Sequence, residues 1–354
     1  MTLVKISFVI PFTQSTGGIK IIFQYANRLK ERGHDVTIFV PMKAYSFNNK
    51  GISGFFKTVK ASIGNTLKRR TKVDWFDVKV PIKLVPAIKN SFIEDGDIII
   101  ATAWPTAYDV NNLKDSKGKK FYFVQGYERW SGDDQLVDDT YRLPLKPIVI
   151  SSWLDELLKK KFQRNDSVIV YNGIDTTEFY NNEKRYDDTY NLLLMYHPLK
   201  SKGYSDGVKA YEDVKKIFPQ AKLSIFGIDK CKDIPEGAVF YMKPNKEQLR
   251  ELYSNADVYI FPSHQEGWGL TPIEAMACKC AVVGSNVGAL MEVGINKVNA
   301  LTSSPGDVEA LSKNIQLILK DRTLLRSISE NGFKTAMGLS WDKAVENLIQ
   351  ILKS

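Results

Sequence analysis

Residues 258–277 read VYIFPSHQEGWGLTPIEAMA, and this stretch decides the fold prediction. Its first part, Val258–Pro262, is a short apolar run rich in β-branched and aromatic residues, which is typical of a buried strand. A glycine-rich loop follows, and Pro272 favours the start of a helix, since a first helical turn does not use its amide hydrogens. Strand, loop and helix in this order predict one βα unit of a parallel sheet.

The same alternation runs along the whole chain. The expected strands are Lys5–Pro11, Asp35–Val40, Asp97–Ala101, Lys120–Val124 and Pro147–Ile150, then Leu192–Tyr196, Lys222–Gly227, Ala238–Tyr241, Val258–Pro262 and Ala281–Gly284. The expected helices include Ile19–Arg32, Gly207–Ile217, Lys246–Asn255, Pro272–Ala277 and Asp307–Lys320. Strands that alternate with helices in this way predict parallel sheets covered by helices on both faces.

A chain of 354 residues is long for one core and suits two domains. The pattern restarts after a polar stretch, so we place the boundary near residues 170–188. The expected domains are 1–172 and 173–338, with 339–354 as a C-terminal helix that packs back on the first domain.

The net charge of +9 is uneven, with 27 Lys and Arg against 17 Asp and Glu in residues 1–172 and 22 against 23 in the remainder. The basic excess is densest in Lys50–Lys72, where no acid occurs and apolar residues alternate with cations. At helical spacing this pattern favours a helix lying on anionic lipid. A solvated helix with a basic face is the alternative, and nucleic acid is disfavoured because no recognition motif accompanies the charge.

Several classes are disfavoured by what the sequence lacks. No apolar run approaches the ~20 residues of a membrane span, and Met1–Pro11 has no cleavage site, so we expect an unprocessed cytoplasmic protein. Three cysteines and three histidines without ligand spacing make a zinc site or a disulfide scaffold unexpected.

Two glycine-containing loops are candidate ligand sites. Gly17 and Gly18 stand between the first strand and its helix, where backbone amides can approach an anion, although a turn that only needs positive φ is the alternative. Glu266 and Glu274 flank the loop of residues 267–271; Glu266 suits sugar hydroxyls and Glu274 ribose hydroxyls, while the loop amides and helix dipole favour a diphosphate. The alternative for Glu274 is a carboxylate that caps the first turn of the helix.

Several segments of the sequence resemble those of a known family. Glu266–Glu274 is similar to the E-x7-E element, within the longer E-G-[FW]-G-L-x-x-x-E-A-M-A pattern, of the retaining glycosyltransferase family 4, which has the GT-B fold. Other segments agree in order and spacing, and the resemblance covers nearly the whole chain: Gly17-Gly18, Asn172–Asp175 with Phe179, Lys202-Gly203, Asn255–Val258 with Pro262-Ser263, and Ser340-Trp341.

The resemblance implies an α/β protein of two Rossmann-like domains that face each other across a cleft, the first binding the acceptor and the second the nucleotide-sugar donor. It implies that Lys202 contacts the donor diphosphate, Glu266 the transferred sugar and Glu274 the ribose. Backbone amides near the phosphates would come from Gly267, Trp268, Gly269, Leu270 and Thr271. Such enzymes need no divalent metal and no other cofactor.

The chain departs from the family pattern at two candidate catalytic positions. His197 stands where an arginine is usual, so it is either protonated beside the phosphates or has another role. Gln125 stands where a histidine often faces the reaction centre. Gln125–Glu128 resembles a Q-x-[YF]-E segment of some rhamnosyl and cell-surface polysaccharide transferases; the alternative is that Gln125 and Glu128 only hold a loop in place.

The sequence therefore predicts a retaining, metal-independent glycosyltransferase that moves a sugar from a nucleotide-sugar to a glycan or lipid-linked acceptor in cell-envelope polysaccharide or glycoconjugate synthesis. Front-face attack is expected, because no side chain is an evident nucleophile. A catalytically inactive sugar-nucleotide-binding or accessory subunit is the main alternative. A phosphorylase or epimerase on the same scaffold is a third reading.

Overall fold

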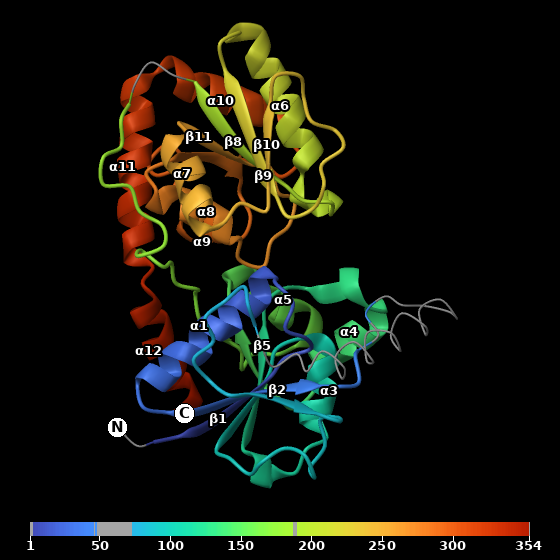
Figure 1. The fold of residues 1–354 in the computed structure, drawn as a ribbon. Coiled ribbons are helices and arrows are strands. Elements are labelled where there is room, and N and C mark those ends of the chain that lie inside the picture. The colour runs from blue at the N-terminus through green and yellow to red at the C-terminus, as the bar shows by residue number, and fades with distance from the viewer. Residues whose placement is uncertain (1–2, 46, 48–72, 187–189, 354) are drawn as a thin grey trace. The chain divides into compact units, whose positions relative to one another are not determined.

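The computed structural model describes residues 3–45, 47, 73–186 and 190–353. The chain divides into two compact units (Figure 1). The first runs up to Tyr171 and takes in the chain again from Val345 onward, whereas the second comprises Asn172–Ala344. Helix α12 (Trp341–Lys353) therefore begins in the second unit and ends in the first.

In the first unit, seven strands of the described residues form a parallel sheet in the order β3-β2-β1-β4-β5-β6-β7. The strands are β1 (Lys5–Val9), β2 (Asp35–Pro41), β3 (Ile82–Val85), β4 (Ile98–Ala101), β5 (Lys119–Val124), β6 (Lys146–Val149) and β7 (Val168–Ile169). The connecting helices include α1 (Gly17–Glu31), α3 (Trp104–Asn111), α4 (Asp134–Thr140) and α5 (Ser152–Phe162).

The strand order places β1 between β2 and β4, so the chain leaves β1 toward one sheet edge and later returns to its other side. In open parallel sheets such a reversal opens a crevice at the carboxyl ends of the two central strands, and ligands bind there. The loop after β1 leads to α1, where the Thr16 hydroxyl accepts the Ile19 amide and caps the helix. Gly17 and Gly18 are the first two residues of that helix.

The second unit repeats this plan with a six-stranded parallel sheet in the order β10-β9-β8-β11-β12-β13. Its strands are β8 (Asn191–Tyr196), β9 (Lys222–Gly227), β10 (Val239–Met242), β11 (Val258–Phe261), β12 (Ala281–Ser285) and β13 (Leu301–Ser303). Its helices are α6 (Tyr204–Ile217), α7 (Lys246–Asn255), α8 (Leu270–Ala277), α9 (Ala289–Val293), α10 (Val308–Lys320) and α11 (Arg322–Gly338). Here the reversal lies between β8 and β11, which pair directly.

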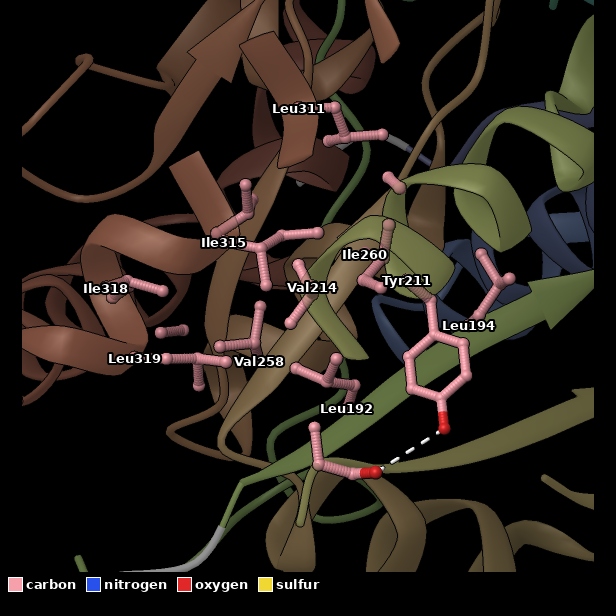
Figure 2. Packing of buried hydrophobic residues seen from close by; sticks show 14 of the residues in the cluster. Leu192, Leu194, Tyr211, Val214, Val258, Ile260, Leu311, Ile315, Ile318 and Leu319 are labelled. Atoms are coloured by element: carbon pink, nitrogen blue, oxygen red, sulfur yellow. Dashed lines mark hydrogen bonds between the residues drawn. The ribbon is translucent and has the colours of Figure 1, made fainter. Parts of the chain in front are cut away.

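A continuous apolar cluster holds the second unit together (Figure 2). Leu192, Leu194, Val258 and Ile260 point from β8 and β11 toward Val214 on α6 and toward α10, and each of these side chains is buried. Figure 2 also shows the Tyr211 ring in this cluster, where its hydroxyl donates to the Ala221 carbonyl at 3.4 Å. Burying a side chain of this size contributes about 1.5–3 kcal/mol, so the cluster fixes β8 and β11 side by side.

The expected βα alternation agrees with the structure, and the ten expected strands lie within two residues of observed ones. Short elements were missed, among them the edge strands β3, β7 and β13 and the helices α3 and α5. Helix α8 begins at Leu270 rather than Pro272, because Gly269 adopts φ +81° and the chain turns into the helix two residues early. Pro272 is then the third helical residue, whose amide is not needed.

Within the described ranges, no helix has the combination of length and apolar character that a membrane crossing requires. The basic segment Lys50–Lys72 lies outside the described residues.

We expect Gly118→Ala to destabilise the first unit much more than Gly33→Ala. Both glycines have positive φ, +110° and +88°, so each alanine carries a cost of about 1–2 kcal/mol from its backbone conformation. A Cβ at Gly118 would also lie 2.4 Å from the Ile98 amide nitrogen. A Cβ at Gly33 would have no atom within 4 Å apart from its own residue and the two residues next to it in the chain. Thermal unfolding of the two variants tests this, and equal melting temperatures would contradict the packing of Gly118 against β4.

Candidate functional site

The carboxyl ends of β8 and β11 lie side by side and carry most of the predicted donor-site residues. The strands are in register from Leu192 with Val258 to Leu194 with Ile260. The loop after β8 contains His197 and Lys202, and the loop after β11 contains Glu266. This is the reversal point of the second sheet, where parallel α/β sheets bind ligands.

Lys202 and Glu266 form an ion pair across these two loops. The Lys202 ammonium donates to both carboxylate oxygens, at 2.8 and 2.7 Å, and the Ser263 hydroxyl donates to Oε1 at 2.9 Å. Glu266 is 8% exposed, so its charge needs these polar partners. The side chains therefore form a paired, hydrogen-bonded group of opposite charges at the edge of the sheet.

Gly203 positions Lys202. A short 3-10 turn, Lys200–Lys202, ends at Gly203 with φ +66°. A Cβ at Gly203 would lie only 2.0 Å from the Pro262 carbonyl oxygen, so the turn packs directly against the end of β11. Glycine alone satisfies both constraints, which explains the Lys-Gly pair in the sequence.

The loop of residues 266–269 is held by a second glycine turn. Gly288 has φ +56°, and a Cβ there would lie 2.3 Å from the Trp268 carbonyl oxygen and 2.7 Å from the Glu266 Cβ. The Ala289 amide donates to that same carbonyl at 2.5 Å, and the Trp268 side chain is buried. Gly267, Trp268 and Gly269 thus form a packed loop that leads into α8.

The first-turn amides of Leu270 and Thr271 have no intrahelical acceptor, and the helix dipole favours an anion beside them.

Glu274 does not occupy the first turn of α8, as the sequence had suggested, and it is not a cap of that turn. Because the helix starts at Leu270, Glu274 is its fifth residue and is 6% exposed. The buried Tyr253 hydroxyl donates to Oε2 at 3.2 Å, and burial raises the pKa of this tyrosine well above its usual value, so the hydroxyl remains a donor. The tyrosine therefore orients the Glu274 carboxyl.

His197 is half-buried, and its Nδ1 accepts the Leu199 amide at 3.1 Å. Burial lowers the pKa of the imidazole, the nearby Lys202 lowers it further, and Asp229 and Glu266 oppose these effects. Of the two roles that the sequence left open, this environment favours a neutral ring with its proton on Nε2 rather than an imidazolium.

In the first unit, Gln125 follows β5 and lies beside the first turn of α1. A Cβ at Gly18 would lie 3.3 Å from the Gln125 Nε2, whereas the space around Gly17 is open. The pair Gly17-Gly18, which the sequence placed in a loop, thus opens α1, and Gly18 lies beside Gln125. Both belong to the first unit, whereas the other candidate residues belong to the second.

Sequence reasoning did not select three groups that the geometry brings forward. Ser263 binds Glu266, and the His264 imidazole lies 2.6 Å from the Asp206 carboxylate at the start of α6. Glu128, for which the sequence left open that it only holds a loop in place, accepts a hydrogen bond from the Trp104 amide at 2.8 Å. In the sequence, the only signal for Ser263 and Glu128 was that each lies in a loop that follows a buried strand.

In the described part of the chain, no group of three or more His, Cys, Asp or Glu side chains is arranged to hold a metal ion. Cys231, Cys278 and Cys280 are free thiols.

Comparison with known proteins finds a family model that is similar to most of the second unit. Residues 176–335 match the family model "Glycosyl transferases group 1". The chain is similar to the capsular polysaccharide biosynthesis glycosyltransferase CapM of Staphylococcus aureus, with 24% identity over 46% of this chain and 47% of the relative. It is also similar to the O-antigen chain mannosyltransferase B of Escherichia coli, with 36% identity over 30% of this chain and 28% of the relative. The matches thus span about half the length, or less, of these curated relatives.

The fold likeness extends over the whole chain. A crystal structure of Anabaena Alr3699/HepE in complex with UDP and glucose superimposes with a TM-score of 0.75, covering 99% of each chain at 13% identity. The two parallel-sheet units agree with this likeness and confirm the predicted fold class. Residues 176–335 are thus similar to the glycosyl transferases group 1 family, and the chain as a whole has the GT-B fold.

Proposed function

We propose that the protein is a retaining glycosyltransferase of family 4 that transfers a sugar from a nucleotide-sugar to a glycan or lipid-linked acceptor in cell-envelope polysaccharide synthesis. The Lys202–Glu266 pair carries the proposal, because it lies at the reversal point of the second sheet beside the N-terminus of α8. A cation, a carboxylate and unbonded helix amides in one place suit a sugar joined to a diphosphate.

Each group has a distinct part in this proposal. The Lys202 ammonium and the amides of Leu270 and Thr271 stabilise negative charge on the diphosphate as the bond to the sugar C1 breaks. Glu266 accepts hydrogen bonds from hydroxyls of the transferred sugar, and Glu274, oriented by Tyr253, accepts those of the ribose. Because these groups supply the positive charge, we propose that the reaction needs no divalent metal.

The anomeric configuration at C1 is retained if the acceptor oxygen attacks C1 on the face that the diphosphate leaves. The new C1–O bond forms as the old one breaks, and the acceptor proton passes to the departing diphosphate oxygen. None of the described carboxylates needs to act as a nucleophile in this route. His197, held as a neutral donor through Nε2, would hydrogen-bond the ligand without adding charge.

The named relatives support the substrate class. One is named for capsular polysaccharide and one for an O-antigen chain, and the solved neighbour was crystallised with UDP and glucose. These names favour envelope polysaccharide as the product, and they leave the nucleotide and sugar to experiment. The competing function, a subunit that binds the sugar nucleotide without turnover, is favoured by the replacement of arginine by His197 and of histidine by Gln125.

We expect one member of a panel of UDP-, GDP-, ADP- and dTDP-sugars to raise the melting temperature. A ligand present at 100 times its Kd stabilises the folded state by about 2.7 kcal/mol, which corresponds to several degrees. Lys202→Met should remove this rise, whereas Lys200→Met, on the same 3-10 turn but exposed, should keep it.

Because Lys202→Met leaves the Glu266 charge without its cation, the unliganded protein should also melt earlier. The double variant Lys202→Met/Glu266→Gln removes that orphaned charge and should restore the melting temperature without restoring the ligand effect. If all sugar nucleotides fail to stabilise the wild type, or the two lysine variants respond alike, the donor site is wrongly placed.

Glu266→Gln should lower sugar transfer by about 100-fold or more while the protein stays folded, because the carboxylate that holds the reacting sugar is neutralised. The measurement is product formation with the donor found by the panel. Glu178→Gln is the matched control, since Glu178 also pairs with a lysine of the second unit, Lys246, at 3.0 Å. A wild type that binds the donor and neither transfers nor hydrolyses it would favour the accessory subunit instead.

We also propose that the protein works at the cytoplasmic face of a membrane, attached through the basic segment Lys50–Lys72. Neutralising Lys68, Arg69 and Arg70 should weaken sedimentation with anionic vesicles, more at low than at high salt, because exposed charges are screened over ~10 Å at 0.1 M salt. The control removes three exposed lysines of the second unit, Lys216, Lys313 and Lys320. Equal loss in both triple variants would mean that overall charge, not this segment, drives binding.

A further inference from the structure

Glu128 has a half-satisfied carboxyl at the edge of the first sheet where the strands have their carboxyl ends. It follows β5, and its Oε2 accepts the Trp104 amide at 2.8 Å and the Tyr122 hydroxyl at 3.3 Å. Its own amide donates to the Tyr141 hydroxyl at 3.4 Å. The other carboxyl oxygen, Oε1, has no hydrogen-bond partner among the described residues. One oxygen is therefore fixed by the fold and the second is left to accept.

The surroundings of Glu128 match a polyhydroxylated ligand. Trp104 begins α3 directly after β4, so Glu128 lies where the carboxyl ends of β4 and β5 meet. Gln125, three residues earlier, lies against Gly18 at the N-terminus of α1. Carboxyl, amide and helix N-terminus at one sheet edge offer both acceptors and donors, which sugar hydroxyls require.

The charge on Glu128 has no cation to balance it. Within the described residues, no lysine or arginine pairs with it: Arg129 pairs with Asp134 and Asp138, and Lys161 with Asp138. Burial raises the pKa of the Glu128 carboxyl to about 7, and the bonds from Trp104 and Tyr122 only partly oppose this. Tyr122 and Tyr141, the titratable groups packed against it, have pKa values raised by burial and stay neutral in this range.

A loop-holding role alone does not require this carboxylate. Two donors, an amide and a tyrosine hydroxyl, are satisfied equally by the carbonyl oxygen of a glutamine, which has no charge to desolvate. A carboxylate without a cation costs stability at neutral pH, so its presence here points to a ligand that uses the charge.

We propose that Glu128 is an acceptor-binding residue whose Oε1 accepts a hydrogen bond from a hydroxyl of the acceptor sugar. This inference rests on the proposed glycosyl transfer and names a residue of its acceptor side. A hydrogen bond to an ionised carboxylate is stronger than one to a neutral acceptor, and the hydroxyl keeps its proton, so Glu128 stays charged when the acceptor is bound.

The test measures kcat/KM for the acceptor from pH 5.5 to 8.5, with the donor found by the nucleotide-sugar panel and n-octyl glycosides of glucose, galactose, mannose and rhamnose as acceptor probes. Wild-type kcat/KM should rise through a pKa near 7 as the carboxyl ionises. Glu128→Gln should lower it about 10-fold or more at pH 8 through a higher acceptor KM and should flatten the profile. Glu156→Gln, an exposed glutamate of the same unit, should leave both unchanged.

Stability gives a second reading that needs no ligand. A carboxyl whose folded pKa is raised contributes stability that is fully present below its unfolded pKa and is lost as pH rises through the folded value. Wild type should therefore melt progressively earlier than Glu128→Gln between pH 5 and pH 8. Tyr122→Phe, which removes one donor and keeps the carboxyl, should retain the pH-dependent kcat/KM.

The inference is overturned if Glu128→Gln, folded and active, shows the wild-type acceptor KM and pH profile, or if Tyr122→Phe abolishes the profile to the same extent. Donor-induced stabilisation and donor hydrolysis should survive in Glu128→Gln. Their loss from the wild type itself would instead refute the proposed function, and the acceptor role would fall with it.

Discussion

The candidate donor site depends on the direct parallel pairing of β8 with β11. These strands are more than 60 residues apart in sequence, and their register sets Lys202 and Glu266 at hydrogen-bond distance. Apolar side chains of β8, β11, α6 and α10 fix that register through a single cluster. A one-residue slip would turn alternate side chains away from α6, so packing specifies the pairing strongly.

The ion pair that results is better explained by a ligand than by stability. A buried pair recovers only part of the desolvation that each charge costs, and apolar replacements are often as stable. Two glycines with positive φ, Gly203 and Gly288, also constrain the loops that bring the charges together, and neither position tolerates a side chain. Glycine adopts positive φ without strain, so these two positions let the loops pack closely enough to bring the charges together.

The sequence predicted the central strands well and the site less completely, for a physical reason. Buried strands such as β11 are continuous runs of apolar residues, so local composition identifies them. The edge strands β3 and β7 are short and partly exposed, and composition gives little signal for them. The start of α8 and the position of Glu274 depended on the φ of Gly269, which a sequence does not display. The Lys202–Glu266 bond and the Trp104–Glu128 bond join segments that are 64 and 24 residues apart, so only the folded chain reveals them.

The two units use carboxylates at their sheet edges in opposite ways. In the second unit, Glu266 is bound by an ammonium and a hydroxyl, and both of its oxygens are already engaged before a ligand arrives. A sugar hydroxyl must therefore share or displace these bonds, while the lysine also attracts an anion.

In the first unit, Glu128 is held through one oxygen by neutral donors, so the other is open and the charge is costly. A group that holds an activated, negatively charged donor needs a cation beside it, whereas a group that receives a neutral hydroxyl works best without one, because a cation would weaken its basicity. The contrast between the two glutamates matches the different charges of the two substrates in the proposed glycosyl transfer.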